Sequence, residues 1–136
     1  MPETERVAAT VRAYMSAFDD QDEEAMNALQ VEGAHLIMVR EGAGDQKPVS
    51  RSVTLSDANR SIASSTRDLV EPIAITALMV EGPVAMAWAD YSLFVDGEKS
   101  HCGIDIFTLV RIGEEWKIAT ITYSHIDEPC ENSPEL

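Results

Sequence analysis

Residues 84–126, VAMAWADYSLFVDGEKSHCGIDIFTLVRIGEEWKIATITYSHI, decide the fold of this chain. The stretch is rich in β-branched and aromatic residues, and Asp96-Gly97 and Gly113-Glu114 have the composition of tight turns. We therefore expect strands over 84–95, 100–111 and 116–126, preceded by a strand over 73–80 that Gly82-Pro83 ends. The second half of the chain is thus predicted to be an antiparallel meander.

The first half of the chain has helical periodicity instead. Apolar residues recur at three- and four-residue steps from Val7 to Phe18, as on one face of a helix. The elements expected before residue 72 are a helix over 3–19, a short helix after Asp22, a strand over 34–40, a loop over 41–53 and a helix from 56 or 57 to 69. Helices followed by a meander predict an α+β fold, with helices on one face of the sheet.

Length and charge exclude several classes of protein. A chain of 136 residues and 14.9 kDa is predicted to be one domain, 1–136, with a flexible acidic tail over 127–136. A net charge of −14 repels phosphate backbones and anionic lipids, so we expect no nucleic-acid or membrane partner. No apolar run has the length of a membrane span, and the acidic N-terminus does not resemble a signal peptide. A cytoplasmic location is the expectation.

The cysteines and histidines predict neither a disulfide framework nor a metal site. We expect Cys102 to be a buried thiol and Cys130 to be free in the tail. His35, His101 and His125 lack the spacing of metal ligands, so neither a metal nor another cofactor is expected. The chain also has no phosphate-binding glycine loop, no Gly-x-Ser-x-Gly motif and no Cys-x-x-Cys motif, which excludes the chemistries that need them.

The two turns allow the strand register to be predicted. A two-residue turn at Asp96-Gly97 places Trp88 opposite Asp105. Arg111 opposite Trp116 then places Asp105 opposite Thr122. One face of the sheet is predicted to hold Met86, Trp88, Asp90, Ser92, His101, Asp105, Phe107, Leu109, Trp116, Ile118, Thr120 and Thr122. A slip of one residue would exchange the faces of a strand.

Both predicted faces are too apolar to lie against water. The face described above is interrupted by acidic and histidine side chains, as ligand pockets are. The opposite face is predicted to hold Ala85, Ala87, Ala89, Tyr91, Cys102, Ile104, Ile106, Thr108, Val110, Ala119, Ile121, Tyr123 and His125. Because the helices can cover one face of the sheet, we expect a homodimer through this smoother outer face.

These motifs resemble those of the nuclear transport factor 2-like superfamily, and most closely the bacterial putative lumazine-binding group. The resemblance covers about residues 5–126 and is carried by Tyr14-x-x-x-Phe18-x-x-x-Asp22, Trp88-x-Asp90-Tyr91, Ser100-His101-Cys102-Gly103-x-Asp105-x-Phe107 and Trp116-Lys117-Ile118-Ala119. It implies three helices packed in the concave face of a curved antiparallel sheet, a cystatin-like roll with an internal pocket. Relatives include ketosteroid isomerase, scytalone dehydratase, polyketide cyclases, epoxide hydrolases and binding modules, so the fold implies no single activity.

Three polar residues of the predicted pocket face are candidates for catalysis: Asp90, His101 and Asp105. A carboxylate in an apolar pocket has a raised pKa and suits proton abstraction beside a carbonyl. The alternative is structural, with Asp90 and His101 as a satisfied polar pair and Asp105 as a buried hydrogen-bond anchor. The expected ligand-binding residues are Tyr14, Phe18, Met86, Trp88, Phe107, Trp116, Thr120 and Thr122.

Three functions are compatible with these features. The first is a homodimeric protein that binds a small apolar or aromatic molecule between helices and sheet. The second is an isomerase, dehydratase or cyclase that works without a cofactor, by general acid–base catalysis from a pocket carboxylate. The third is a protein-interaction module that uses the outer face of the sheet.

Overall fold

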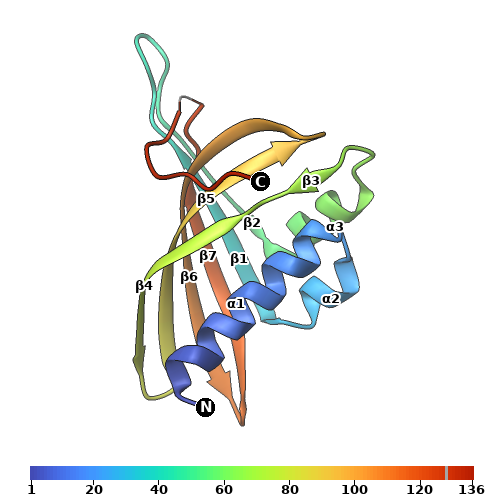
Figure 1. Ribbon diagram of the computed structural model, residues 1–136, viewed down its shortest axis with the longest axis vertical. Coiled ribbons are helices and arrows are strands. Elements are labelled where there is room, and N and C mark those ends of the chain that lie inside the picture. Colours follow the sequence, from blue (N-terminus) through green and yellow to red (C-terminus); the bar gives the residue numbers. More distant parts are fainter. Residues whose placement is uncertain (128) are drawn as a thin grey trace.

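The computed structural model describes residues 1–127 and 129–136 and consists of helices laid against a long curved sheet (Figure 1). The helices are α1 (Glu3–Asp19), α2 (Glu23–Asn27) and α3 (Leu55–Ser64). The strands are β1 (Gln30–Arg40), β2 (Val49–Thr54), β3 (Leu69–Val70), β4 (Ile73–Glu81), β5 (Val84–Val95), β6 (Glu98–Ile112) and β7 (Glu115–Ser124). The strand order is β2-β1-β7-β6-β5-β3, with β4 also paired to β5. The predicted α+β fold is confirmed.

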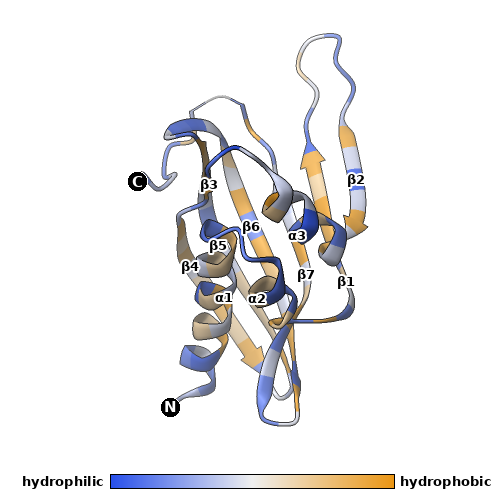
Figure 2. Ribbon diagram, turned by 90° about the vertical axis from the view of Figure 1, so that its right-hand side faces the viewer, coloured by the Kyte–Doolittle hydropathy of each residue, from blue (hydrophilic) through white to orange (hydrophobic). Residues whose placement is uncertain are grey.

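The sheet is mixed rather than wholly antiparallel. β1 and β7 run parallel, whereas every other strand pair in the described chain is antiparallel. The three helices lie on one side of this sheet, and Figure 2 views the molecule from that side, with the helices in front of the strands. That side is the inner face, and the core lies between it and the helices.

Local capping explains where the two shorter helices begin. The side chain of Asp22 accepts a hydrogen bond from the Ala25 backbone N–H at 3.1 Å, which caps α2 as predicted. Thr54 caps α3 in the same way, through the Asp57 N–H at 3.2 Å. The third helix therefore begins at Leu55. It ends at Ser64, five residues before the predicted end. The predicted loop over 41–53 is wrong in its last part, because β2 begins at Val49.

The predicted strand register is correct beside each turn and wrong farther away. Val95 pairs with Glu98, as a two-residue turn requires, but an irregularity between Leu93 and Phe94 shifts the rest of β5 by one residue. Asp105 therefore pairs with Ala89, not Trp88. A second shift, between Thr108 and Leu109, pairs Asp105 with Tyr123 instead of Thr122. Because a shift of one residue exchanges faces, several predicted side chains point to the other side of the sheet.

The corrected register sorts the faces differently. Small and aromatic residues of β5 that were expected on the outer face lie inside and are buried: Ala85, Ala87, Ala89 and Tyr91. Met86, Trp88 and Asp90 alternate with them and lie on the outer face, where Trp88 is 39% exposed. The homodimer expected through the outer face stays a prediction.

Gly103 makes a close approach that this core requires. It pairs with Tyr91, whose hydroxyl crosses to donate a hydrogen bond to the Ser124 carbonyl at 2.8 Å. A Cβ atom at position 103 would collide with that carbonyl oxygen and with the Ser124 side chain. Glycine therefore lets β6 and the end of β7 pack together at this point.

A disulfide and hydrogen bonds join the C-terminal segment to the sheet, while the flexibility expected of residues 127–136 stays a prediction. Cys102 and Cys130 form a disulfide, with their Cα atoms 6.2 Å apart, so the predictions of a buried thiol and a free Cys130 are wrong. Ile126 exchanges backbone hydrogen bonds with Cys102, and Lys99 pairs with Glu135 at 2.8 Å. Across the described residues, no helix is long and apolar enough to cross a membrane.

Candidate functional site

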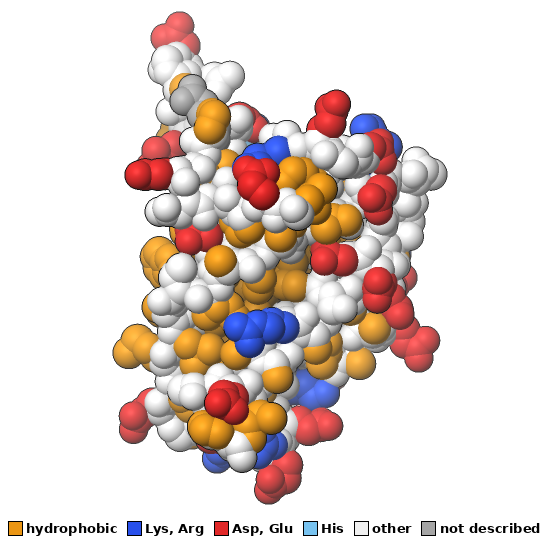
Figure 3. Space-filling view, viewed as in Figure 1, with side chains coloured by type: hydrophobic (Ala, Val, Ile, Leu, Met, Phe, Trp, Pro, Cys, Tyr) orange, Lys and Arg blue, Asp and Glu red, His pale blue; other side chains and the backbone are white. Residues whose placement is uncertain are grey.

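A cavity of about 260 Å³ lies between α1, α3 and the inner face of the sheet. Its walls are mainly apolar and include Phe18 from α1, Leu55 from α3, and Phe107 and Ile121 from the sheet. The surface seen from the helical side carries apolar side chains along its middle, with acidic side chains scattered toward its edges (Figure 3). Such a cavity favours a small apolar body over a charged one.

Two carboxyl groups meet in this cavity: Asp105 on β6 and Glu71, which lies between β3 and β4. Asp105 is 3% exposed. The two carboxyl groups are joined by a hydrogen bond, which requires one of them to be protonated. The buried Oδ2 of Asp105 has no hydrogen-bond partner among the described residues.

Burial dominates the electrostatics of this pair. Loss of water raises the pKa of Asp105 to about 6. Burial, the nearby Asp105 charge and the shared hydrogen bond together raise the pKa of Glu71 well above its ordinary value. The contact between the two groups raises the pKa of Glu71 and lowers that of Asp105, so Glu71 favours the shared proton and Asp105 the negative charge. This direction makes Asp105 the candidate base and Glu71 the candidate acid.

The segment that carries Glu71 is positioned by the end of α1. The Glu71 backbone N–H donates to Asp19 Oδ1 at 2.8 Å. Gln21, in the turn after α1, donates to the Ile62 carbonyl at 3.0 Å and accepts from the Leu69 N–H at 3.3 Å. These bonds fix the connection between α3 and β4, so Glu71 is held toward Asp105 from outside the cavity.

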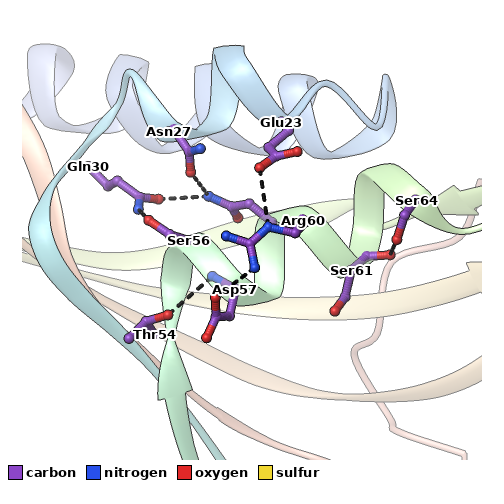
Figure 4. Close-up of polar contacts among 10 residues, drawn as sticks. Glu23, Asn27, Gln30, Thr54, Ser56, Asp57, Arg60, Ser61 and Ser64 are labelled. Carbon is purple, nitrogen blue, oxygen red and sulfur yellow. Dashed lines mark hydrogen bonds and ion pairs between the residues drawn. The ribbon is translucent and has the colours of Figure 1, made fainter.

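Tyr14 lines the cavity from α1 and is held by a buried polar network. Its hydroxyl donates to Asn59 Oδ1 at 2.5 Å, and burial raises the pKa of the phenol. Asn59, which is fully buried on α3, donates to Asn27 Oδ1 and Gln30 Oε1, both at 2.8 Å. Figure 4 shows Asn27 and Gln30, two of the partners, beside α3. The Tyr14 hydroxyl proton is therefore engaged, and its ring forms a fixed wall.

His101 lines the end of the cavity near the C-terminal segment. Its ring stacks on that of His125 with centroids 3.7 Å apart. Burial, and next the neighbouring His125, lower the pKa of His101 to about 4. The imidazole is therefore neutral at pH 7 and donates one hydrogen bond. Tyr123, opposite Asp105, also lines the cavity, and no described residue hydrogen-bonds to its hydroxyl.

The structure brings together five of the predicted site residues and separates the rest. Those that line the cavity are Tyr14, Phe18, His101, Asp105 and Phe107. Trp116 is buried near the start of α1, where its Nε1 donates to Glu3 at 2.7 Å. The residues placed on the outer face, away from the cavity, are Met86, Trp88, Asp90, Thr120 and Thr122. The pairing of Asp90 with a pocket histidine is thus wrong, because the irregularity in β5–β6 turns Asp90 outward.

Glu71, Asn59 and Tyr123 were missed by the sequence analysis. Glu71 had a usable signal, because it is a lone acidic residue within the apolar stretch LVEPIAI, residues 69–75. The contact between Glu71 and Asp105 could not be foreseen, because the two residues are 34 positions apart in the sequence. Among residues 1–127 and 129–136, no cluster of three or more His, Cys, Asp or Glu side chains could hold a metal ion.

Comparisons with known proteins agree with this architecture. The family model described as putative lumazine-binding matches residues 2–124. A nuclear transport factor 2-like protein of unknown function from Shewanella baltica has a TM-score of 0.69 at 16% identity, covering 94% of this chain and 95% of that one. Another such protein, from Cytophaga hutchinsonii, has a TM-score of 0.75 at 11% identity, covering 93% and 100%.

A third similar structure is described as a putative dehydratase of the same family from Streptomyces avermitilis. Its TM-score is 0.70 at 13% identity, covering 91% of this chain and 96% of that one. No curated protein matches this sequence. At these identities the similar structures show the fold alone, whereas the family model covers most of the chain. With its helices on a curved sheet and its internal cavity, the chain belongs to the putative lumazine-binding family of nuclear transport factor 2-like proteins.

Proposed function

We propose that this protein binds a small apolar or aromatic molecule in its cavity and moves a proton on it through Asp105, in an isomerase or lyase reaction. The observation that carries the proposal is the buried carboxyl pair of Asp105 and Glu71. A purely structural Asp105 would have its oxygens satisfied by fixed donors, as buried polar groups usually are. Its Oδ2 instead has no hydrogen-bond partner among the described residues.

The reaction proposed is proton abstraction from a carbon next to a carbonyl. The Asp105 carboxylate takes the proton, and the electron pair of the C–H bond moves to the carbonyl oxygen to give an enolate. If the enolate is conjugated with a C=C bond, return of the proton from Asp105 to the far carbon completes an isomerisation. If the β-carbon carries a hydroxyl group, that group takes the proton from Asp105 and leaves as water, which completes a dehydration. The Tyr123 hydroxyl and the neutral His101 imidazole are the donors available for the developing oxyanion.

Glu71 gives the carboxyl pair a connection to solvent. Besides the cavity, it lines a surface groove between α1 and β4, together with Asp19 and Pro72. A proton taken up by Asp105 can therefore leave through Glu71 without crossing the bound molecule. One structural neighbour is described as a putative dehydratase, which is consistent with this class of chemistry.

Exchange of protons on a simple ketone tests the proposed chemistry directly, whatever the natural substrate is. We expect the protein to accelerate deuterium incorporation at the carbons beside the carbonyl of 2-tetralone in D₂O, followed by NMR. Asp105→Asn should lower this acceleration at least tenfold, because general-base catalysis contributes roughly 10²–10⁴-fold to a rate. Asp90→Asn is the matched control, because Asp90 is on the outer face of the same strand pair.

Two results would contradict proton transfer at Asp105: exchange no faster than in buffer, or acceleration that Asp105→Asn leaves unchanged. Binding of 2-tetralone without exchange would instead support a binding protein that uses the same cavity. Thermal shifts measured on the same samples report that binding.

A further inference from the structure

Besides the carboxyl pair, the inner face of the sheet carries a row of arginine and histidine side chains near the ends of β1 and β7. Met38 pairs with Tyr123 across β1 and β7, so Arg40 and His125 come next on the same face. Arg40 Nη2 lies 2.6 Å from His125 Nε2, and the His125 ring stacks on His101, which lines the cavity. The row thus extends one wall of the cavity toward β1.

Arg51 adds a second guanidinium to this side. It pairs with Met38 across β1 and β2, on the same face, and no described carboxylate lies within ion-pair distance of it. The charges of Arg40 and Arg51 both act on the Tyr123 hydroxyl, which belongs to the cavity wall. In a protein of net charge −14, this is a local concentration of positive charge beside an apolar cavity.

The hydrogen-bonding capacity of Arg40 is incompletely used. Its Nε is buried and has no hydrogen-bond partner among the described residues. The one described carboxylate within ion-pair distance is that of Asp127, whose Oδ1 lies 3.7 Å from Nη2, too far for a hydrogen bond. Nε and Nη2 form the side of the guanidinium that a carboxylate engages with two parallel hydrogen bonds. This side of the Arg40 guanidinium therefore has no described carboxylate bound to it by two hydrogen bonds.

Asp127 is a weakly held occupant of this position. Its side chain is 67% exposed, and its close contact is with His125 Nε2 at 2.9 Å rather than with Arg40. Exposed ion pairs contribute roughly 0–1 kcal/mol, so a ligand could displace this carboxylate at small cost. A bidentate acceptor in the position of Asp127 would bond Nη2 and also supply the partner that the buried Nε lacks.

We propose that the ligand of this cavity is a small amphipathic carboxylate, whose apolar body fills the cavity while its acid group replaces Asp127 at Arg40 and His125. This inference rests on the proposed use of the cavity and names the chemical class of the molecule. His101, which lines the cavity and stacks on His125, lies between the two regions. The Asp127 carboxylate competes with the acid group of the ligand for Arg40 and His125.

The test compares two probes of the same shape, 2-naphthoate and its neutral analogue 2-naphthamide, by titration calorimetry on the full chain. We expect 2-naphthoate to bind at least tenfold more tightly than the amide. Arg40→Gln should remove this preference by weakening naphthoate binding at least tenfold while leaving amide binding unchanged. Asp127→Asn should strengthen naphthoate binding several-fold, also without effect on the amide.

Arg60→Gln is the matched control, because Arg60 forms exposed ion pairs on α3 and should affect neither probe. Equal affinities for the two probes, or a preference that survives Arg40→Gln, would overturn the carboxylate inference while leaving the cavity as a binding site. If neither probe binds, both the inference and the proposed use of the cavity fail. If Arg40→Gln does not fold, the direction of the Asp127→Asn effect decides: unchanged or weaker naphthoate binding overturns the inference.

Discussion

Asp105 and Asp90 lie on adjacent strands of one sheet, yet their surroundings differ. Asp105 faces the cavity, is 3% exposed and shares a hydrogen bond with Glu71. Asp90 faces outward and is half-buried. Burial raises the pKa of the inner carboxyl group to about 6, because the charged form loses its hydration. Which side of the sheet a carboxylate occupies therefore decides whether it can serve as a base at neutral pH.

Replacing Asp105 should stabilise the protein at high pH. Because its folded pKa of about 6 exceeds its ordinary value of 3.8, the folded state keeps a proton that the unfolded state has lost between these values, and stability falls as pH rises. The full shift corresponds to about 3 kcal/mol. We expect Asp105→Asn to raise the free energy of unfolding at pH 8, and this gain to shrink by about 1 kcal/mol at pH 5. Urea denaturation at both pH values measures it.

The difference between variant and wild type is the informative quantity, because His101 acts in the opposite sense. Its pKa is lowered from 6.5 to about 4, so the unfolded state binds more protons in that range and stability rises with pH. Subtracting the wild-type free energy of unfolding from that of the variant at each pH removes the His101 contribution, which both proteins share. A variant that is less stable than wild type at pH 8 would show that Asp105 is a structural anchor.

At the scale of elements, the sequence predicts helices, strands and turns well but not the registry between strands. The turn at Asp96-Gly97 fixes the pairing of the residues beside it, because its composition selects a two-residue hairpin. The irregularities farther along, at Leu93 and at Thr108, have no comparable signal in the residues. The register error also affects the candidate site. Asp105 lines the cavity as predicted, whereas Asp90 does not.

Contacts between elements were also beyond the sequence. Asn59 joins three of them: it bonds Tyr14 on α1, Asn27 at the end of α2 and Gln30 at the start of β1. Nothing in the spacing of these residues indicates that they converge, since each amide could equally be solvated. Because Asn59 also accepts the hydrogen bond of Tyr14, it connects the packing of the helices to the wall of the cavity.

Removing the Asn59 side chain should destabilise the helical layer. Asn59→Ala leaves the buried Tyr14 hydroxyl and two half-buried amides, those of Asn27 and Gln30, without these bonds, and each buried unsatisfied group costs roughly 1–3 kcal/mol. We expect the free energy of unfolding to fall by about 3 kcal/mol in urea denaturation. Ser64→Ala, on an exposed position of the same helix, should change it little. Equal effects of the two substitutions would mean that the network contributes no stability.

At the scale of the whole molecule, the C-terminal segment is a structural part of the fold. The composition of residues 127–136, with its acids and prolines, suggested a free end, and a count of two cysteines could not reveal their pairing. The disulfide between Cys102 and Cys130 closes a loop with a sequence separation of 28 and holds the segment beside the row that contains His101 and His125. The tail is thus covalently joined to the strand that carries His101.

Breaking this link should lower global stability. The chain-entropy estimate for a loop of this length is about 3.5 kcal/mol, so we expect Cys130→Ser to lose about 3 kcal/mol in urea denaturation without reductant. Wild-type protein unfolded in the presence of dithiothreitol should match the variant. Identical unfolding of wild type and variant without reductant, or two free thiols in the mass of the alkylated native protein, would contradict the disulfide.

The proposed chemistry depends most directly on the protonation of the carboxyl pair, and NMR titration of the Asp105 and Glu71 side-chain carboxyl carbons measures it. We predict that Asp105 titrates near pH 6 and that Glu71 stays protonated well above its ordinary range. We also predict that Glu71→Gln changes the midpoint of Asp105, because the two groups share one proton. If both carboxyl groups titrate at ordinary values and independently of each other, the cavity holds no base of the kind proposed.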